Sequence, residues 1–165
     1  MMNTLTDKLA QKQLAIEGKP LGPGSHTEHE GKTMTGAQAI IASLEAEGVD
    51  TVFGYPGGQA IKIYDALYDS KKLHHVLARH EQGATHMADG YARANGIGAM
   101  LTTYGVGDLS AICGLAGACA EHVPVVLISG TPPLYAMESR LRVHHSLAEG
   151  NFDNINNCLK QFTAN

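Results

Sequence analysis

The segment RHEQGATHMADGYARA, residues 79–94, joins two kinds of secondary structure and therefore decides which fold the chain can adopt. It is entered through HHVLARH (74–80), whose short apolar run favours a buried strand. From Glu81 onward the apolar side chains follow helical spacing, which is seen at Ala84, Met87, Ala88 and Tyr91. The sequence thus predicts a strand that leads directly into a helix, with the half-buried carboxylate of Glu81 at the junction.

Outward from this junction, the same alternation covers the chain from Met34 onward. The predicted strands are VDTVFG (49–54), HHVLARH (74–80), IGAMLTTYG (97–105) and VPVVLISG (123–130). The predicted helices are residues 36–47, which Thr35 caps and Gly48 ends, and residues 59–70, 81–94, 108–122 and 150–162. This order predicts an α/β fold, a parallel sheet with helices on both faces, in which VPVVLIS is a strand buried on both sides.

Composition divides the chain into a flexible N-terminal extension, residues 1–33, and one domain, residues 34–165. The extension combines a possible short helix with KPLGPGSHTEHEGKT (19–33), which is rich in Gly, Pro and polar residues and is typical of a linker. His26 and His29 lie in this linker, where solvated side chains are a simpler interpretation than metal ligands.

The overall charge and the cysteines exclude several classes of function. The net charge of -4 leaves no basic footprint for nucleic acid, and no apolar run is long enough to span a membrane. The three cysteines form no CxxC pair and are odd in number, which favours a reduced, cytoplasmic compartment. Cys113 and Cys119 lie on a helix of small residues, and we expect them in the core.

Ligands of parallel α/β sheets bind beyond the carboxyl ends of the strands. Glu81 follows such an end, and so do three glycine-bearing turns, at residues 55–58, 104–107 and 130–133. None of the turns matches G-x-G-x-x-G or a P-loop, so a nucleotide phosphate site is not favoured. A carboxylate in a small apolar pocket can instead share a proton with a ring nitrogen, although a plain helix-start residue favoured by the helix dipole is the alternative.

FGYPGG (53–58) followed by RHEQGATHMADGYARA resembles the N-terminal, pyrimidine-binding domain of thiamine-diphosphate-dependent enzymes. Over residues 34–95 the chain is most similar to the large subunit of acetolactate synthase. Over residues 97–165 it is similar to pyruvate and indolepyruvate decarboxylases, through LTTYGVGDLSAICGLAGACAEHVPVVLISGTP (101–132) and RVHHSLAEGNF (142–152).

The resemblance implies a specific role for three side chains. In this family the glutamate that matches Glu81 hydrogen-bonds N1′ of the aminopyrimidine of thiamine diphosphate and activates the cofactor for attack on a 2-oxo acid such as pyruvate. His144 and His145 match a histidine pair that relays protons near the substrate in the decarboxylases. The resemblance assigns cofactor binding to Glu81 and to two turns, which comprise Pro56, Gly57, Gly58, Tyr104, Gly105, Val106 and Gly107.

The two halves of the chain imply different reactions. The decarboxylases carry an aspartate in a PGD motif, where this chain has Gly58 as the synthases do, whereas SGTP (129–132) stands where synthases have SGQ. We expect an acetolactate synthase-like function, which joins pyruvate to a second 2-oxo acid in branched-chain amino acid biosynthesis. The alternatives are a 2-oxo acid decarboxylase that releases an aldehyde, and a non-catalytic subunit or inactive fragment.

These enzymes hold Mg²⁺ and the diphosphate through a Gly-Asp-Gly motif that this sequence lacks, so no metal ligand is predicted here. The resemblance therefore implies that a missing or partner diphosphate-binding domain completes the site, that the pyrimidine-binding domain is C-terminally incomplete, and that the chain forms a homo- or hetero-oligomer. Lys160 loosely matches a lysine of both groups, and a packing role is equally open. We interpret five other histidines as structural or exposed: His74, His75, His80, His86 and His122.

Overall fold

The protein was analysed as a computed structural model that describes residues 33–146 and 150–163. Its centre is a four-stranded parallel sheet in the order β2-β1-β3-β4. The strands are β1 (Thr51–Gly54), β2 (His74–Leu77), β3 (Gly98–Thr102) and β4 (Val125–Ser129). The predicted α/β fold is therefore confirmed. The predicted extension, including His26 and His29, falls outside the described residues except for Thr33.

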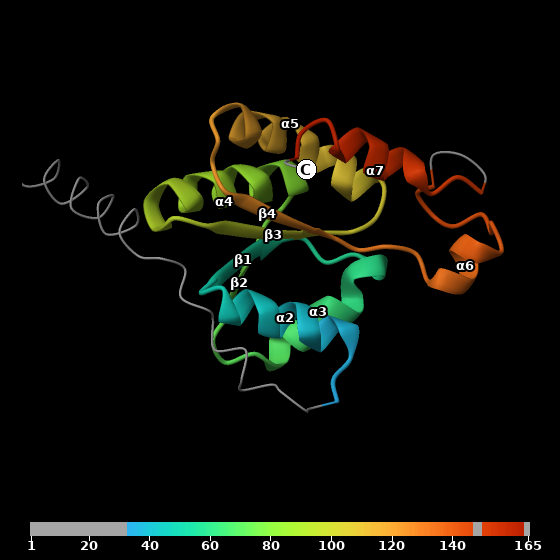
Figure 1. Ribbon diagram of the computed structural model, residues 1–165, viewed down its shortest axis with the longest axis horizontal. Coiled ribbons are helices and arrows are strands. Elements are labelled where there is room, and N and C mark those ends of the chain that lie inside the picture. Colours follow the sequence, from blue (N-terminus) through green and yellow to red (C-terminus); the bar gives the residue numbers. More distant parts are fainter. Residues whose placement is uncertain (1–32, 147–149, 164–165) are drawn as a thin grey trace, which may run out of the picture. The chain divides into compact units, whose positions relative to one another are not determined.

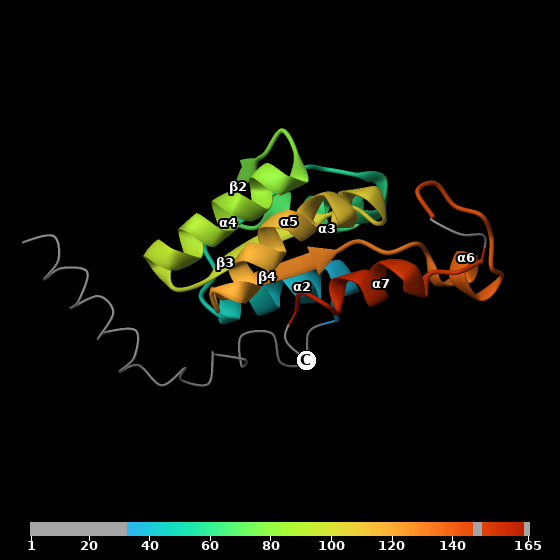
Figure 2. The same ribbon diagram turned by 90° about the horizontal axis from the view of Figure 1, so that it is seen from above.

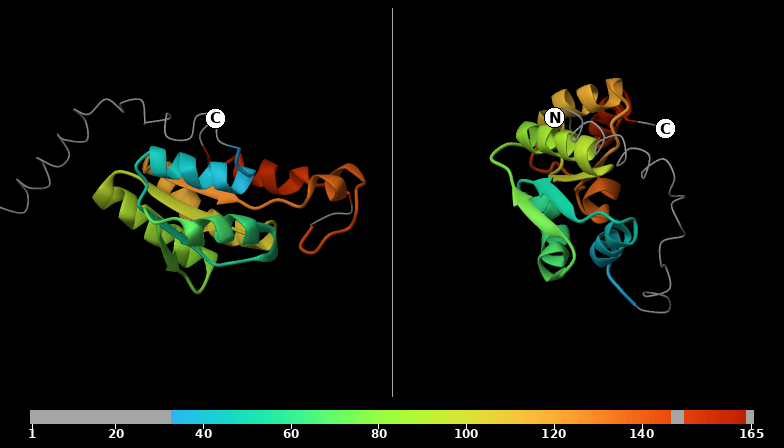
Figure 3. Two further views of the ribbon diagram at one scale, coloured as in Figure 1. Left: turned by 90° about the horizontal axis from the view of Figure 1, so that it is seen from below. Right: turned by 90° about the vertical axis from the view of Figure 1, so that its left-hand side faces the viewer.

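Helices cover both faces of this sheet, as predicted (Figure 1). One layer contains α4 (Glu81–Asn95), α5 (Val106–Ala120) and α7 (Asp153–Leu159), and the other contains α2 (Gly36–Ala46) and α3 (Ile61–Asp69). The end-on view in Figure 3 shows the strands between these two layers, and Figure 2 shows α4 and α5 side by side. A 3-10 turn, η2 (Gly58–Ala60), precedes α3. The short helix α6 (Leu134–Glu138) was not predicted, and α7 is shorter than the predicted 150–162.

The start and the end of α2 follow directly from its sequence. The hydroxyl of Thr35 accepts a hydrogen bond from the Gln38 backbone N–H at 3.2 Å, and the Gln38 side chain accepts from the Thr35 N–H at 2.9 Å. This reciprocal capping box satisfies backbone donors that a helix start leaves without partners. Gly48 follows the helix with φ +78°, a conformation that side chains disfavour, and so ends it as predicted.

The strand β3 lies at the centre of the sheet and divides the core in two. All five of its residues are buried, and because side chains alternate along a strand, Met100 joins one cluster and Leu101 the other. The Met100 cluster packs under α4, α5 and α7 and includes Ala84, Ala88, Leu115 and Ile155. The Leu101 cluster packs under α2 and α3 and includes Ile41, Leu44, Val52 and Leu67.

The two outer strands are less buried than predicted. VPVVLIS was expected to be covered on both sides, but β4 is an edge strand and Val126 is 37% exposed. The strand β2 is the other edge, and Leu77 is 60% exposed. An apolar run does not distinguish a central strand from an edge strand, because strand order depends on how the chain crosses over.

The two cysteines predicted for the core, Cys113 and Cys119, are exposed instead. The buried face of α5 consists of small or aliphatic residues at helical spacing, namely Ala111, Gly114, Leu115 and Ala118. That spacing turns positions 113 and 119 outward. Similarly, α4 buries Ala84, Thr85, Ala88 and Ala92, while Met87 is 37% exposed.

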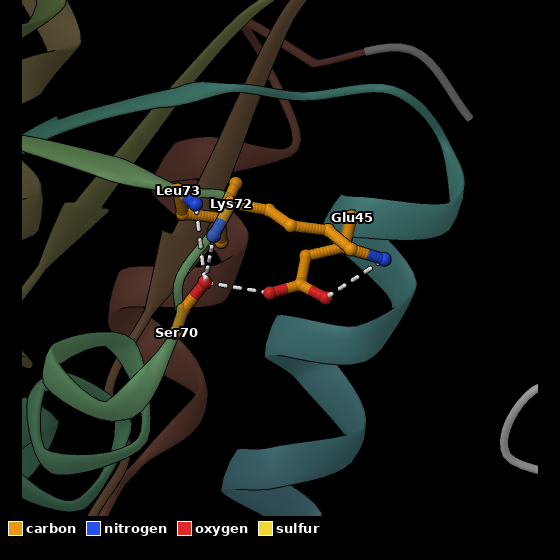
Figure 4. Close-up of polar contacts among 4 residues, drawn as sticks. All are labelled: Glu45, Ser70, Lys72 and Leu73. Atoms are coloured by element: carbon orange, nitrogen blue, oxygen red, sulfur yellow. Dashed lines mark hydrogen bonds and ion pairs between the residues drawn. The ribbon is translucent and has the colours of Figure 1, made fainter.

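A polar clip holds α2 to the turn before β2 (Figure 4). The Ser70 hydroxyl donates to Glu45 at 2.6 Å and accepts from the backbone N–H groups of Lys72 and Leu73 at 3.2 and 3.1 Å. Lys72 also forms an ion pair with Glu45 at 3.9 Å. The clip fixes the start of β2 and thus the strand that leads to Glu81. Among the described residues, no helix is both long and apolar enough to cross a membrane.

Candidate functional site

Glu81 is the first residue of α4 and lies beyond the carboxyl end of β2. His80, in extended conformation, caps the helix: its Nδ1 accepts from the Gln82 N–H at 3.2 Å. The adjacent Ala78 N–H donates to the Gly54 carbonyl of β1 at 2.9 Å, which keeps the chain against the sheet up to the junction. Glu81 is half-buried, as expected from its position.

Two of the predicted glycine turns meet beside Glu81. A Cβ atom on Gly107 would lie 3.2 Å from Glu81 Oε1 and 2.9 Å from Thr103 Cγ2. A Cβ atom on Gly57 would also collide with the Thr103 side chain. Because both positions lack a side chain, the backbone at Gly107 approaches the carboxylate closely, and the backbone at Gly57 approaches Thr103.

The third turn reaches the first one. A Cβ atom on Gly130 would be 2.8 Å from the Gln59 backbone, so the segment after β4 packs on η2. The structure therefore brings Glu81 and all three turns to one edge of the sheet, as the sequence predicted.

The other residues of the two turns differ in exposure. Pro56, Gly58 and Val106 are exposed, and a Cβ atom on Gly58 would meet nothing within 4 Å. Tyr104 is only 4% exposed, and its ring lies 6.4 Å from that of Phe152. Burial raises the pKa of Tyr104, and no partner for its hydroxyl was found among the described residues. Its side chain therefore belongs to the core, which leaves its backbone for the edge of the site.

The predicted histidine pair reaches the same turn from the loop before α7. His144 and His145 are exposed, and their ring centroids are 3.7 Å apart. The backbone of His145 has φ +67°, and its carbonyl oxygen would be 2.5 Å from a Cβ atom on Gly105, whose φ is +83°. Thus Glu81 and His145 lie against opposite ends of turn 104–107.

The sequence analysis missed Asp108, which is completely buried at the start of α5. Its Oδ1 accepts from the Thr102 hydroxyl at 2.5 Å, and its Oδ2 accepts from the Gly105 N–H at 3.1 Å. Burial raises the pKa of Asp108, although its hydrogen bonds oppose the rise and the charge of Glu81 adds to it. A usable signal was present, since Asp108 is the only charged residue between residues 94 and 120.

Tyr64 is a second neighbour that the sequence analysis did not place at the site. Its hydroxyl fills the space that a side chain on Gly54 would occupy, and it donates to the Leu101 carbonyl at 3.5 Å. Burial raises the pKa of Tyr64 and the negative charge of Glu81 raises it further, so the phenol stays neutral near the carboxylate.

The remaining histidines do not assemble a metal site. His75 is half-buried with its ring 5.1 Å from that of Tyr64, and burial lowers its pKa, whereas His74, His80, His86 and His122 are exposed. No group of three or more His, Cys, Asp or Glu side chains within residues 33–146 and 150–163 is placed to hold a metal ion.

Lys160 lies outside the site around Glu81. It lines a groove of about 920 Å³ between α5, β4 and α7, together with residues such as Leu115, Val125, Leu127 and Phe162. Glu81, His144 and His145 do not line this groove.

The profile of the family described as "Thiamine pyrophosphate enzyme, N-terminal TPP binding domain" matches residues 34–156, which is more than half of the chain. The chain belongs to this family. Its fold, a parallel sheet between two helical layers, and the position of Glu81 at the carboxyl edge agree with the resemblance found in its sequence.

This thiamine pyrophosphate-binding domain has relatives of two kinds. It is 53% identical over 98 residues to an acetolactate synthase large subunit of Mycobacterium tuberculosis, which covers 59% of this chain and 16% of the relative. It is 52% identical over 101 residues to a probable acetolactate synthase large subunit of Methanocaldococcus jannaschii, covering 61% and 17%. It is 41% identical over 114 residues to a pyruvate decarboxylase of Hanseniaspora uvarum, covering 69% and 20%. The chain thus spans a fifth or less of the length of these relatives.

The residues at the edge fit the aminopyrimidine ring of thiamine pyrophosphate. A flat ring with a basic nitrogen needs a carboxyl group at that nitrogen and close backbone on its face. Half-buried Glu81 offers a carboxyl group at this edge, and the backbone of Gly107 borders that carboxyl group closely.

Proposed function

We propose that this domain forms the pyrimidine-binding wall of an acetolactate synthase-like enzyme, which decarboxylates pyruvate and joins the product to a second 2-oxo acid. The observation that carries the proposal is the contact of Glu81 with the backbone of Gly107: Glu81 Oε1 lies 3.2 Å from the position where Gly107 lacks a Cβ atom. No side chain separates the carboxylate from this backbone, so turn 104–107 fixes the position of Glu81 at the carboxyl edge of the sheet.

In the proposed site, residues of this chain would bind the aminopyrimidine ring of the cofactor, and one of them would hold a proton. Glu81 would share a proton with a ring nitrogen of the aminopyrimidine, while Gly57 and Gly107 present backbone to the ring. When bound, thiamine diphosphate supplies an electron-accepting thiazolium ring for decarboxylation of a 2-oxo acid. Tyr64, half-buried and neutral, lies close enough to Glu81 to be affected by its charge.

A set of exposed apolar residues, called the apolar rim below, supports association with a second domain or subunit. We define the rim as these exposed large hydrophobic residues at the ends of the strands or in the segments after them: Tyr55, Ile61, Leu77, Val106, Leu134, Tyr135 and Leu141. Exposed apolar surface concentrated at one edge is typical of an interaction site. The proposed partner is a diphosphate-binding domain or subunit, which would also supply the Mg²⁺ ligands, in a homo- or hetero-oligomer.

The second candidate function is a 2-oxo acid decarboxylase that releases an aldehyde. The contact between His145 and Gly105 favours it, because it brings a titratable pair to the turn that also borders Glu81. Histidine can donate a proton near neutral pH and so supports an aldehyde product. Against it stands Gly58, where the decarboxylase resemblance expects an aspartate.

The test joins this chain to a diphosphate-binding domain and compares it with its Glu81→Gln variant, using pyruvate, thiamine diphosphate and Mg²⁺. The variant should retain cofactor binding and lose activity by about 100-fold or more, because general acid–base groups contribute about that much. Product analysis separates the candidates, since acetolactate supports the synthase and acetaldehyde the decarboxylase. Near-normal rates in Glu81→Gln would remove Glu81 from the reaction and refute the proposal.

A further inference from the structure

Asp108 is a fully buried carboxyl group at the meeting point of three segments. It accepts hydrogen bonds from the Thr102 hydroxyl at the end of β3 and from the Gly105 N–H in turn 104–107. The Ser129 hydroxyl, at the end of β4, donates to the Gly130 carbonyl instead, at 3.2 Å. One side chain at the start of α5 therefore links the end of β3 to the turn.

That turn borders both chemical groups of the site. Its Gly107 end lies close to Glu81 Oε1, and its Gly105 end lies against the backbone of His145. Interiors are close-packed, so a shift of the turn would displace both contacts together. The atom that Asp108 holds, the Gly105 N–H, belongs to the residue with the least common backbone conformation of the turn, φ +83° and ψ -107°.

We propose that Asp108 is a positioning residue that fixes turn 104–107. It thereby fixes the backbone of Gly107 beside Glu81 and the backbone of Gly105 beside His145. The geometric part of this inference stands by itself, while its importance for catalysis rests on the proposed function. A buried carboxyl group is costly unless hydrogen bonds satisfy it, so its presence at this point is explained by the donors that it organises.

The experiment compares the full-length chain with Asp108→Ala and Asp108→Asn by NMR. Three signals report on the turn: exchange of the Gly105 amide relative to that of Met100 in β3, the shift of the Gly107 amide, and the shift of the His145 imidazole. Asp108→Ala should speed the relative exchange of Gly105 at least tenfold and move the other two signals. Asp108→Asn should restore most of the protection, because an amide can accept from the Gly105 N–H and donate to the Thr102 hydroxyl.

The matched control is Leu67→Ala, which weakens the core on the opposite face of the sheet. It should lower the melting temperature and leave the three signals in place. If Asp108→Ala leaves them unchanged, or Leu67→Ala moves them equally, the proposal is overturned. Should Asp108→Ala not fold, Thr102→Val removes one of the donors and should move the same signals less; unchanged signals would again overturn it.

Titration of the complex between this chain and a diphosphate-binding domain with thiamine diphosphate and Mg²⁺ separates this inference from the proposed function. Shifts at Glu81 and Gly107 on titration are expected if the domain binds the aminopyrimidine. If no signal near Glu81 responds while Asp108→Ala still displaces the turn, the proposed function fails and the positioning role of Asp108 stands. If the cofactor binds and Asp108→Ala changes nothing at Gly105 and His145, the positioning role fails alone.

Discussion

The surroundings of Glu81 depend on glycines, which have no Cβ atom. Gly107 brings its backbone close to the carboxylate and to Thr103, Gly57 brings its backbone close to Thr103, and a methyl group at either position would collide with neighbouring atoms. Gly58, next in the first turn, has open space in place of such a neighbour. Neighbouring glycines of the site thus differ in whether they can accept a side chain, and substitution of each one tests this.

Gly107→Ala should disturb the site, because its methyl group would lie 2.9 Å from Thr103 Cγ2 and 3.2 Å from Glu81 Oε1. We expect a loss of about 1–3 kcal/mol in the free energy of unfolding, as for other overpacked positions, and weaker cofactor binding. Urea denaturation and calorimetric titration measure the two effects. Gly83→Ala in α4 is the control, since nothing lies within 4 Å of its Cβ position, and it should be neutral or stabilising. Equal behaviour of the two variants would contradict the close approach.

Asp108 should make folding stability depend on pH in a defined direction. Its folded pKa lies above the usual value, chiefly because of burial, so the folded state binds this proton more tightly than the unfolded state does. Its contribution is greatest below the unfolded pKa of about 3.8 and is lost as pH rises through the folded pKa.

The measurement is urea denaturation of wild type and Asp108→Asn from pH 4 upward. The free energy of unfolding of the wild type, minus that of the variant, should fall with pH and then level off. A difference that stays constant or rises over this interval would show that the carboxyl pKa is not raised.

Gly58→Asp should be tolerated, because the position is exposed, its Cβ site is open and its φ is not positive. We expect a change in the free energy of unfolding within about 0.5 kcal/mol, as for other open surface sites. In a complex with a diphosphate-binding domain, the added acid should shift the product of pyruvate toward acetaldehyde. Gly36→Asp, also without neighbours within 4 Å, is the control and should leave the product unchanged.

The segments that follow β3 and β4 differ in length and in the elements they contain. Turn 104–107 is short and held by Asp108, whereas the segment after β4 contains α6, exposed Leu134 and Tyr135, and the histidine pair before α7. The backbone of His145 packs against Gly105, which brings the pair to turn 104–107.

Replacing either histidine of the pair tests whether this segment takes part in chemistry. If aldehyde release dominates, His144→Ala or His145→Ala should slow acetaldehyde formation by about 100-fold, the usual contribution of a general acid. The assay is acetaldehyde release from pyruvate by the complex with a diphosphate-binding domain, across pH 5.5–8 as a rough range around the histidine pKa. His86→Ala, exposed on α4, is the control. Unaltered rates and pH profile in both variants would leave the pair without a catalytic role.

At the scale of the whole molecule, the chain covers 16–20% of the relatives compared above. The described residues contain the carboxyl edge with its exposed apolar rim and, within them, no group of three or more side chains placed for a metal ion. The cytoplasmic location expected from the unpaired cysteines stays a prediction.

The isolated chain should show no turnover of pyruvate with thiamine diphosphate and Mg²⁺, because the proposed site needs a second domain for the diphosphate. Turnover should appear when a diphosphate-binding domain is added, measured as carbon dioxide release. Activity of the isolated chain would refute the need for a partner. If no partner restores activity while the chain still associates with it, the non-catalytic subunit becomes the better interpretation.

The sequence by itself determined the layers, the three glycine turns and the place of Glu81, because these depend on local periodicity and on the rule that parallel strands share a carboxyl edge. Only the tertiary structure decided strand order, which exposes β4, and the outward rotation of Cys113 and Cys119. It also revealed that Asp108 joins β3 to turn 104–107 and that Tyr64 fills the gap at Gly54. Such contacts depend on crossover geometry and on the exact fit of buried side chains, which a one-dimensional pattern of apolar and polar residues does not contain.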